Sequence, residues 1–148
     1  MTRGGARGVL LIEDNPDDRE LAIRALQTYD PGVAIHHVRD GPEALDFLLG
    51  TGATAEAWAR GAVGVVLLDL TLPKVDGLEV LRRVKGDART RAIPVVVMSS
   101  SREARDVTQC YEAGANSYVV KPLDCEEFND ALRQIGHYWL ALNQLPSG

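Results

Sequence analysis

Five short apolar runs divide the chain into regular blocks, and polar segments with a different periodicity lie between them. Apolar runs of this length, bounded by turn residues, predict strands of a sheet. The runs cover residues 9–12, 33–38, 65–68, 93–98 and 117–120. The second run alternates only loosely, which indicates a strand that is less buried than the first.

The segments between these runs carry apolar residues three or four positions apart, the spacing of a helix. The first segment begins at Asn15 and Pro16, a pair that favours the N-cap and the first position of a helix. The predicted helices cover residues 16–28, 43–49, 77–85, 102–113 and 124–143. Strand and helix alternate five times, which implies an α/β fold with a doubly wound parallel sheet and helices on both faces.

Residues 50–64 are the least regular part of the chain, being small and rich in glycine. The segment is longer than most connections between a helix and a strand. It is therefore either a functional loop or a local elaboration, with Trp58 as its expected anchor.

Composition restricts the classes of protein to consider. With 148 residues, 45% of them apolar, the chain suits a single domain over 1–148, with a core at about 8–135 and an extended C-terminal helix and tail at 136–148. A formal charge of −5 without a dense Lys/Arg cluster argues against binding to nucleic acid or an anionic membrane. There is no secretory signal and no apolar run of about 18 residues, and the two cysteines lack metal-ligand spacing. We expect a cytoplasmic protein.

Four predicted strands end in polar residues of different chemical kinds, namely Glu13-Asp14, Asp69, Ser99 and Lys121. Parallel strands bring their carboxyl ends to one edge of the sheet, where ligands bind in such folds. An aspartate that closes a strand also caps turns, so Asp69 alone would be equally well explained as a turn residue. The four ends together favour a functional site.

Three carboxylates at neighbouring strand ends require a cation or a proton. At about 4 Å and an effective dielectric near 20, a like-charged pair costs about 4 kcal/mol. Mg²⁺ prefers oxygen ligands, so we expect Asp14 and Asp69 to bind it. Glu13 would act through water, and the backbone carbonyl of Thr71 would complete the shell.

Magnesium that keeps water ligands usually meets a phosphoryl group, and Lys121 and Ser99 would then contact its oxygens. These residues occur together with Pro122, Pro73, Gly77 and the segment Ala113-Gly114-Ala115. In this combination, the chain resembles the receiver domain of two-component response regulators over residues of about 8–135.

The resemblance implies a flavodoxin-like five-stranded sheet of order 2-1-3-4-5. It implies that Asp69 accepts a phosphoryl group from a sensor histidine kinase, with Asp14 as a direct Mg²⁺ ligand and with Ser99 and Lys121 on the acyl phosphate. Such a chain is not an enzyme beyond its own phosphorylation and dephosphorylation. It would signal through protein–protein interaction or a change of dimer.

The resemblance implies that Ser99 and Tyr118 form a conformational switch. In the family, the ring of the aromatic residue at the position of Tyr118 moves with phosphorylation. For Tyr118, the alternative is an ordinary aromatic residue on a half-buried strand. Glu13 stands where the family more often has Asp, and Ser99 where Thr is also common. Both keep the required chemistry, although Glu13 can shift metal affinity and the smaller Ser99 can alter the coupling to Tyr118.

The last predicted helix is longer than a receiver domain needs, and its apolar stripe continues into aromatic residues. We expect a homodimer through the fourth helix, the fifth strand and this last helix; the alternative is that the extension folds back onto its own domain. The expected interface residues are Tyr118, Phe128, Leu132, Ile135, Tyr138, Trp139 and Leu142. This extension and the 50–64 segment resemble single-domain regulators paired with bacterial phytochromes, so the kinase partner is expected to be of that kind.

Three other functions share parts of this pattern. An aspartyl-phosphate hydrolase would need a carboxylate two residues after its nucleophile, where this chain has Thr71. A flavodoxin-like cofactor binder would place a flavin phosphate against an acidic edge. A phosphorylation-independent docking module of the same fold is the third alternative. Because no residues follow Gly148, output is expected to come from another protein, a dimer or onward phosphotransfer.

Overall fold

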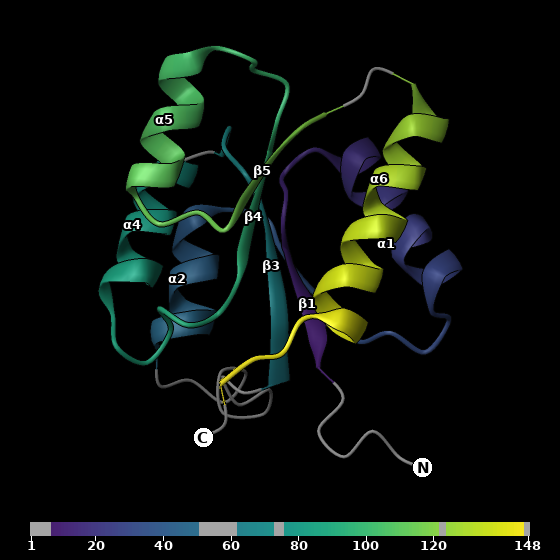
Figure 1. Ribbon diagram of the computed structural model, residues 1–148, viewed down its shortest axis with the longest axis horizontal. Coiled ribbons are helices and arrows are strands. Elements are labelled where there is room, and N and C mark those ends of the chain that lie inside the picture. The colour runs from purple at the N-terminus through teal and green to yellow at the C-terminus, as the bar shows by residue number, and fades with distance from the viewer. Residues whose placement is uncertain (1–6, 51–61, 73–75, 122–123, 147–148) are drawn as a thin grey trace.

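A computed structural model describes residues 7–50, 62–72, 76–121 and 124–146 (Figure 1). Strands and helices alternate along the chain, as the apolar pattern predicts. The elements are β1 (Gly8–Ile12), α1 (Pro16–Tyr29), β2 (Ile35–Val38), α2 (Gly41–Leu49), β3 (Val63–Asp69), α4 (Gly77–Gly86), β4 (Val95–Ser99), α5 (Ala104–Glu112), β5 (Ser117–Val120), α6 (Cys125–His137) and a π-helical turn η2 (Tyr138–Leu142). Trp58 and most of the 50–64 segment lie outside the described residues.

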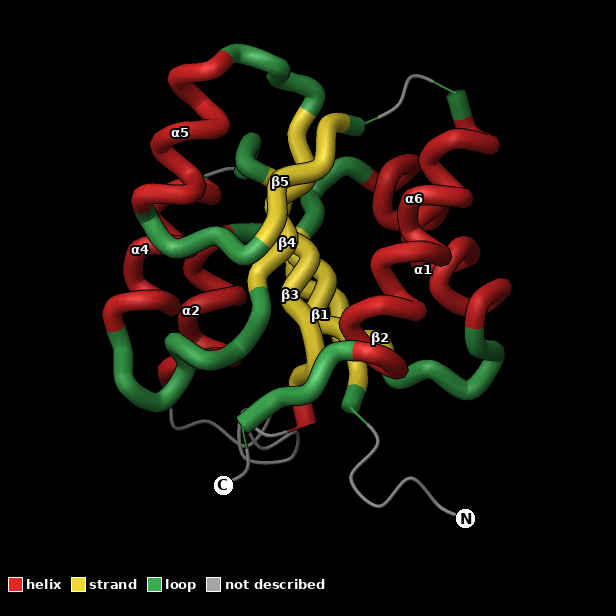
Figure 2. The backbone as a smooth tube through the Cα atoms, in the orientation of Figure 1, coloured by secondary structure: helices red, strands yellow, loops and turns green. Residues whose placement is uncertain are grey.

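The five strands form one parallel sheet in the order β2-β1-β3-β4-β5, so the predicted topology is confirmed (Figure 2). β1 pairs with β2 and β3, so the polar residues at the carboxyl ends of β1 and β3 lie side by side. β4 and β5 continue the sheet beyond β3, and every pair is parallel. All carboxyl ends of the strands therefore meet at one edge.

Helices cover both faces of the sheet. Figure 1 shows α1 and α6 on one face and α2, α4 and α5 on the other. Alternate residues of the central strands enter different cores: Leu10 and Leu68 pack with α2 and α4, whereas Leu11 and Leu67 pack with α1 and α6. Each of these leucines is almost fully buried, which stabilises the fold by about 1.5–3 kcal/mol per side chain. Two such cores explain why successive residues of the central strands, such as Val65 to Leu68, are all apolar.

Polar side chains set the starts of the helices. Asn15 Oδ1 accepts hydrogen bonds from the backbone N–H groups of Asp17 and Asp18, with Pro16 as the first residue of α1. Asp40, Asp76 and Asp124 cap α2, α4 and α6 by accepting from a backbone N–H three residues later. These four helices therefore begin where the sequence provides both a cap and the start of an apolar stripe.

The C-terminal extension differs from the single long helix that its spacing predicts. The α-helix ends at His137, and the next turn is π-helical, with the backbone N–H of Asn143 donating to the carbonyl of Tyr138 at 2.7 Å. η2 lies against β3, where the absence of a side chain on Gly64 leaves room for Leu140. The extension thus partly folds back onto its own domain.

Among the described residues, no helix is long and apolar enough to cross a membrane.

Candidate functional site

The carboxyl edge of the sheet brings together the polar residues that the sequence singled out. Glu13 follows β1, Asp69 ends β3, Ser99 ends β4, and Lys121 follows β5. The backbone N–H of Lys121 donates to the carbonyl of Ser99 at 2.8 Å, which holds Lys121 beside the end of β4. The parallel register therefore converts four distant sequence positions into neighbours.

Three carboxylates form a compact group at this edge. Glu13, Asp14 and Asp69 each offer an oxygen, and these oxygens all lie within 4.8 Å of one another. Glu13 and Asp69 are only 5% and 8% exposed, whereas Asp14 is exposed to solvent. Such a group of hard oxygen donors, open on one side, suits a divalent cation that keeps some water ligands.

Burial and crowding change the titration of this group. Burial, followed by a hydrogen bond with Asp69 and the charge of that residue, raises the pKa of Glu13 to about 8. The Lys121 ammonium and the backbone N–H of Asn15 oppose this shift. Without a cation, the cluster therefore holds a proton at neutral pH, as expected for close carboxylates.

Lys121 lies at the centre of the cluster. Its Nζ is 2.9 Å from Asp18 Oδ2 and 3.2 Å from both Glu13 Oε1 and Asp69 Oδ2. Burial alone would lower the pKa of Lys121, but the hydrogen bond of Asp18 and the charges of Asp69, Glu13 and Asp18 raise it above its usual value. The ammonium therefore stays charged next to the Asp69 carboxylate.

Asp69 makes a local turn contact with one carboxylate oxygen and faces the candidate site with the other. Its Oδ1 accepts a hydrogen bond from the backbone N–H of Thr71 at 3.0 Å, which is a local turn contact, while its Oδ2 faces Lys121. Gly77 lets the following helix start close to this turn, because a Cβ there would lie 2.6 Å from the carbonyl oxygen of Asp69. The turn and the site are therefore built from the same backbone.

Ser99 is connected to Tyr118 through Ser101. Ser99 Oγ accepts from the backbone N–H of Ser101 at 3.1 Å, and Tyr118 Oη donates to the carbonyl of Ser101 at 2.8 Å. Ser101 Oγ also donates to Asp106 Oδ2 at 2.6 Å and accepts from the backbone N–H of Glu103 at 3.2 Å. The predicted pair Ser99 and Tyr118 is thus joined by one residue, Ser101, which the sequence did not single out.

Asp18 is the site residue that the sequence did not single out. Its Oδ2 makes the shortest contact with the Lys121 ammonium, at 2.9 Å. The sequence places Asp18 in the first turn of α1, directly after the strand end that carries Glu13 and Asp14, but nothing in it links Asp18 to Lys121.

The predicted interface residues separate into three groups by burial. Phe128, Leu132 and Ile135 are buried in the core between α6, α1 and the sheet, so they are not available to a partner. Tyr138 and Leu142 are 49% and 63% exposed. Trp139 and Tyr118 are half-buried. Of the predicted interface residues, those most available to a partner are therefore Tyr138 and Leu142 of η2.

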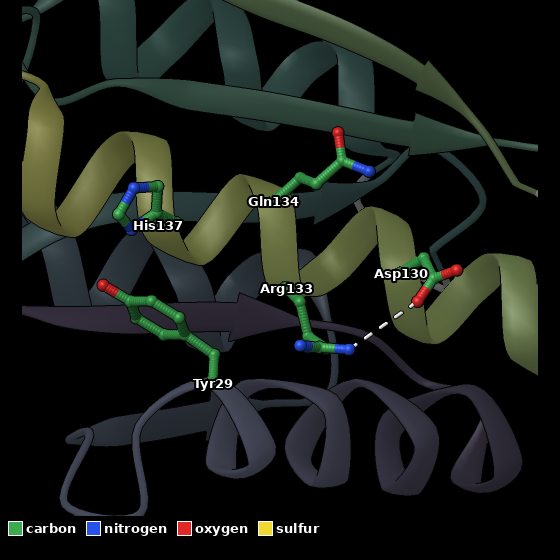
Figure 3. A pocket seen from close by; sticks show the side chains of 5 residues that line it. All are labelled: Tyr29, Asp130, Arg133, Gln134 and His137. Atoms are coloured by element: carbon green, nitrogen blue, oxygen red, sulfur yellow. Dashed lines mark ion pairs between the residues drawn. The ribbon is translucent and has the colours of Figure 1, made fainter.

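A surface pocket lies between α1 and α6, away from the carboxyl edge (Figure 3). The ring of Tyr29 meets that of His137 edge-on at 5.9 Å, and Arg133 pairs with Asp130 at 3.8 Å on the same helix. Tyr29 is the last residue of α1 and His137 is the last residue of α6. The acidic cluster lies instead near the N-terminal end of α1, where Asn15 caps the helix. The pocket therefore plays no part in the strand-end chemistry.

The fold and the acidic edge agree with a known class of protein. A family model described as the response regulator receiver domain matches residues 9–133, so the chain belongs to this family. It is 41% identical over 138 residues to the probable methanogenesis regulatory protein FilR2 of Methanothrix harundinacea, covering 93% of this chain and 86% of that protein.

Two solved structures of individual response regulators are similar to this chain. The phosphorylated cyanobacterial phytochrome response regulator RcpA has a TM-score of 0.87 and 35% identity, covering 95% of this chain and 99% of that one. The Mn²⁺-bound response regulator Rcp1, a protein of Synechocystis, has a TM-score of 0.85 and 33% identity, with coverage of 95% and 99%. The resemblance to phytochrome-associated response regulators is confirmed.

Proposed function

We propose that this chain is a stand-alone phosphoacceptor of two-component signalling, with Asp69 as the residue that is phosphorylated. One observation carries the proposal: a nearly buried Asp69 carboxylate faces the Lys121 ammonium at 3.2 Å and lies in a group of three carboxylates whose oxygens are close enough together to hold a metal ion. An oxygen of Asp69 attacks the phosphorus of a kinase phosphohistidine. The P–O bond forms as the P–N bond breaks, and the imidazole nitrogen keeps the electron pair and takes a proton from water.

The residues of the edge divide this work. Lys121 binds a phosphoryl oxygen as a fixed positive charge, and the Ser99 hydroxyl donates a hydrogen bond to another. Ser99 is suited to donate because its oxygen already accepts from the backbone N–H of Ser101. The motion of Tyr118 would then follow from a shift of Ser99 through Ser101.

The donor set fits Mg²⁺. Asp14 and Asp69 would hold the ion directly, Glu13 through water, and the carbonyl of Thr71 would complete the shell. The bound ion would neutralise the carboxylates and the developing charge on the phosphoryl oxygens. Support comes from the clustered oxygens of Glu13, Asp14 and Asp69 and from the Mn²⁺-bound state named for Rcp1.

The partner we propose is a sensor histidine kinase of the phytochrome kind, in the cytoplasm. The similarity to RcpA, described as a phytochrome response regulator, supports it. Output would pass through a partner protein or a homodimer, with no contact to nucleic acid or membrane. The exposed residues Tyr138 and Leu142 offer an apolar surface for such a contact.

The test is the intact mass of the protein after incubation with a small-molecule phosphodonor such as acetyl phosphate, with Mg²⁺ or with excess chelator. We expect a gain of one phosphoryl group that needs Mg²⁺ and is absent in Asp69→Asn. Asp76→Asn, which changes an exposed helix cap, is the matched control and should still be labelled. If no condition labels the native chain, the docking module that needs no phosphorylation becomes the better explanation.

A further inference from the structure

Asp18 makes the shortest contact of the Lys121 ammonium, although it belongs to none of the strand ends. Its Oδ2 is 2.9 Å from Lys121 Nζ, compared with 3.2 Å for Glu13 Oε1 and Asp69 Oδ2. An ammonium has three N–H donors, so these three carboxylates use all of them. A phosphoryl oxygen on Asp69 would therefore have to replace one of the three partners.

The three partners differ in what else they face. Glu13 and Asp69 offer oxygens to the candidate cation group together with Asp14. Asp18 approaches Lys121 from α1, and its side chain is 33% exposed, compared with 6% for Glu13 and 10% for Asp69. When Glu13 and Asp69 bind a cation and Asp69 carries a phosphoryl group, Asp18 is thus the partner that can remain in contact with Lys121.

Asp18 is also held in place before any ligand arrives. Its backbone N–H donates to Asn15 Oδ1 at 3.1 Å, which fixes the first turn of α1 against the edge of the sheet. A lysine side chain is long and flexible, so an ammonium without such a contact would sample many positions.

We infer that Asp18 is a positioning residue, which holds the Lys121 ammonium beside Asp69 so that it can meet an incoming phosphoryl oxygen. The role rests on the proposed function of the same site. The chemistry stays with Asp69 and Lys121, and Asp18 acts only through Lys121. Because the contact exists without phosphorylation, it can be tested both in the resting chain and during phosphoryl transfer.

The first test measures the reactivity of each lysine in the metal-free protein toward an acetylating reagent, by peptide mass spectrometry. The chain has three lysines, at positions 74, 85 and 121, so the sites are easily separated. We expect Asp18→Ala to raise the labelling rate of Lys121 roughly threefold to fivefold, the size expected for losing an ion pair of this exposure. Lys85 is the internal control, because its Nζ donates to the carbonyls of Arg91 and Ile93.

Asp17→Ala is the matched variant. It removes the same charge from the same helical turn, but Asp17 is exposed and contacts Asn15 through its backbone only. We expect Lys121 labelling in Asp17→Ala to equal that of the native chain. Equal increases in both variants would overturn the inference, since a general change of charge would then explain the result.

The second test measures phosphorylation by acetyl phosphate with saturating Mg²⁺ over a range of donor concentrations. We expect Asp18→Ala to lower the maximal rate constant roughly threefold to fivefold while the half-saturating donor concentration stays the same, because docking is intact and Lys121 is misplaced. An unchanged or faster maximal rate would overturn the inference. Asp18→Asn, which keeps the shape of the side chain, replaces Asp18→Ala if that variant does not fold.

The two tests separate this inference from the proposed function. If the native chain is never phosphorylated, the proposed function fails, and the labelling of Lys121 still decides whether Asp18 holds the ammonium. If phosphorylation occurs and neither test responds to Asp18→Ala, only the positioning role is overturned.

Discussion

At the scale of the residue, the candidate site is governed by the charge balance between two nearly buried carboxylates and one ammonium. Glu13 and Asp69 lie close together, and Lys121 contacts both at 3.2 Å. One ammonium does not fully compensate two carboxylates, so the cluster keeps a proton when no cation is bound. The same shortage of positive charge is what would draw in Mg²⁺.

The retained proton on Glu13 predicts how the stability of the metal-free protein depends on pH. The pKa of Glu13 rises from 4.5 to about 8 on folding, so between these values the folded chain binds more protons than the unfolded chain. The contribution to the free energy of unfolding is therefore complete below pH 4.5 and is lost as the pH rises through 8, with a slope of up to about 1.4 kcal/mol per pH unit. Lys121, whose pKa is raised above 10.5, keeps its charge throughout this window.

Urea unfolding in excess chelator at several pH values measures this slope. The control is Glu13→Gln, which keeps the shape of the side chain and cannot titrate, so its stability should fall less steeply between pH 5 and 8. Equal slopes in the two proteins would show that Glu13 does not hold the proton. Adding Mg²⁺ to the native chain should reduce the loss of stability at pH 8, because the cation replaces the proton.

Gly114 gives a second prediction at this scale. Its φ is +106°, and a Cβ would lie 2.7 Å from Lys85 Cγ. We expect Gly114→Ala to destabilise the chain by about 1–3 kcal/mol, because the backbone is strained and the stem of Lys85 must move. Gly86→Ala is the control, since a Cβ there meets nothing within 4 Å. Chemical denaturation of both variants checks the prediction, and equal stabilities would contradict it.

At the scale of the element, helix α5 begins in an unusual way that ties it to the site. Its N-cap residue, Glu103, makes no side-chain cap hydrogen bond. The hydroxyl of Ser101 instead accepts from the backbone N–H of Glu103 and donates to Asp106. Because the backbone of Ser101 also contacts Ser99 and Tyr118, the start of α5 is coupled to both predicted switch residues.

We expect Ser101→Ala to lower the free energy of unfolding by about 0.5–2 kcal/mol, the usual cost of removing a helix cap. The loss should exceed that of Ser100→Ala, because the neighbouring Ser100 is exposed. Thermal or urea unfolding of both variants gives the comparison. A loss that is no larger in Ser101→Ala than in Ser100→Ala would show that the hydroxyl of Ser101 does not cap α5.

The elements also show what the sequence could and could not predict. Apolar runs and cap residues were enough to predict the strands, their parallel sheet and the edge that collects Asp69 and Lys121. The contact of Lys121 with Asp18 could not be predicted from the sequence, because the two residues are 103 positions apart and meet only where the first turn of α1 and the end of β5 share one edge of the sheet. The end of α6 was also missed, since its 3,4 spacing continues through η2 although the backbone changes to a π-turn.

At the scale of the whole molecule, the C-terminal extension does two things. Leu140 fills the space above Gly64 and Trp139 packs against the core, so these residues complete the domain itself. Tyr138 and Leu142 remain at the surface. An extension that only completed its own domain would not need to expose these two large apolar side chains. Their exposure is the reason to expect a partner at this end of the molecule.

The proposed homodimer can be tested by replacing both exposed residues with serine. If truncating each of these side chains costs the dimer about 1 kcal/mol, Tyr138→Ser with Leu142→Ser should weaken the dimer at least about tenfold. Light scattering at micromolar concentration, with and without phosphorylation, measures the assembly. Tyr111→Ser, on α5, locates the contact: Tyr111 is 50% exposed, and loss of the dimer in this variant but not in the double variant would move the interface from η2 to α5. If the native chain is monomeric both with and without phosphorylation, the homodimer is ruled out. Tyr138 and Leu142 would then be expected to contact a different protein, and the signal from phosphorylated Asp69 would have to pass through that partner.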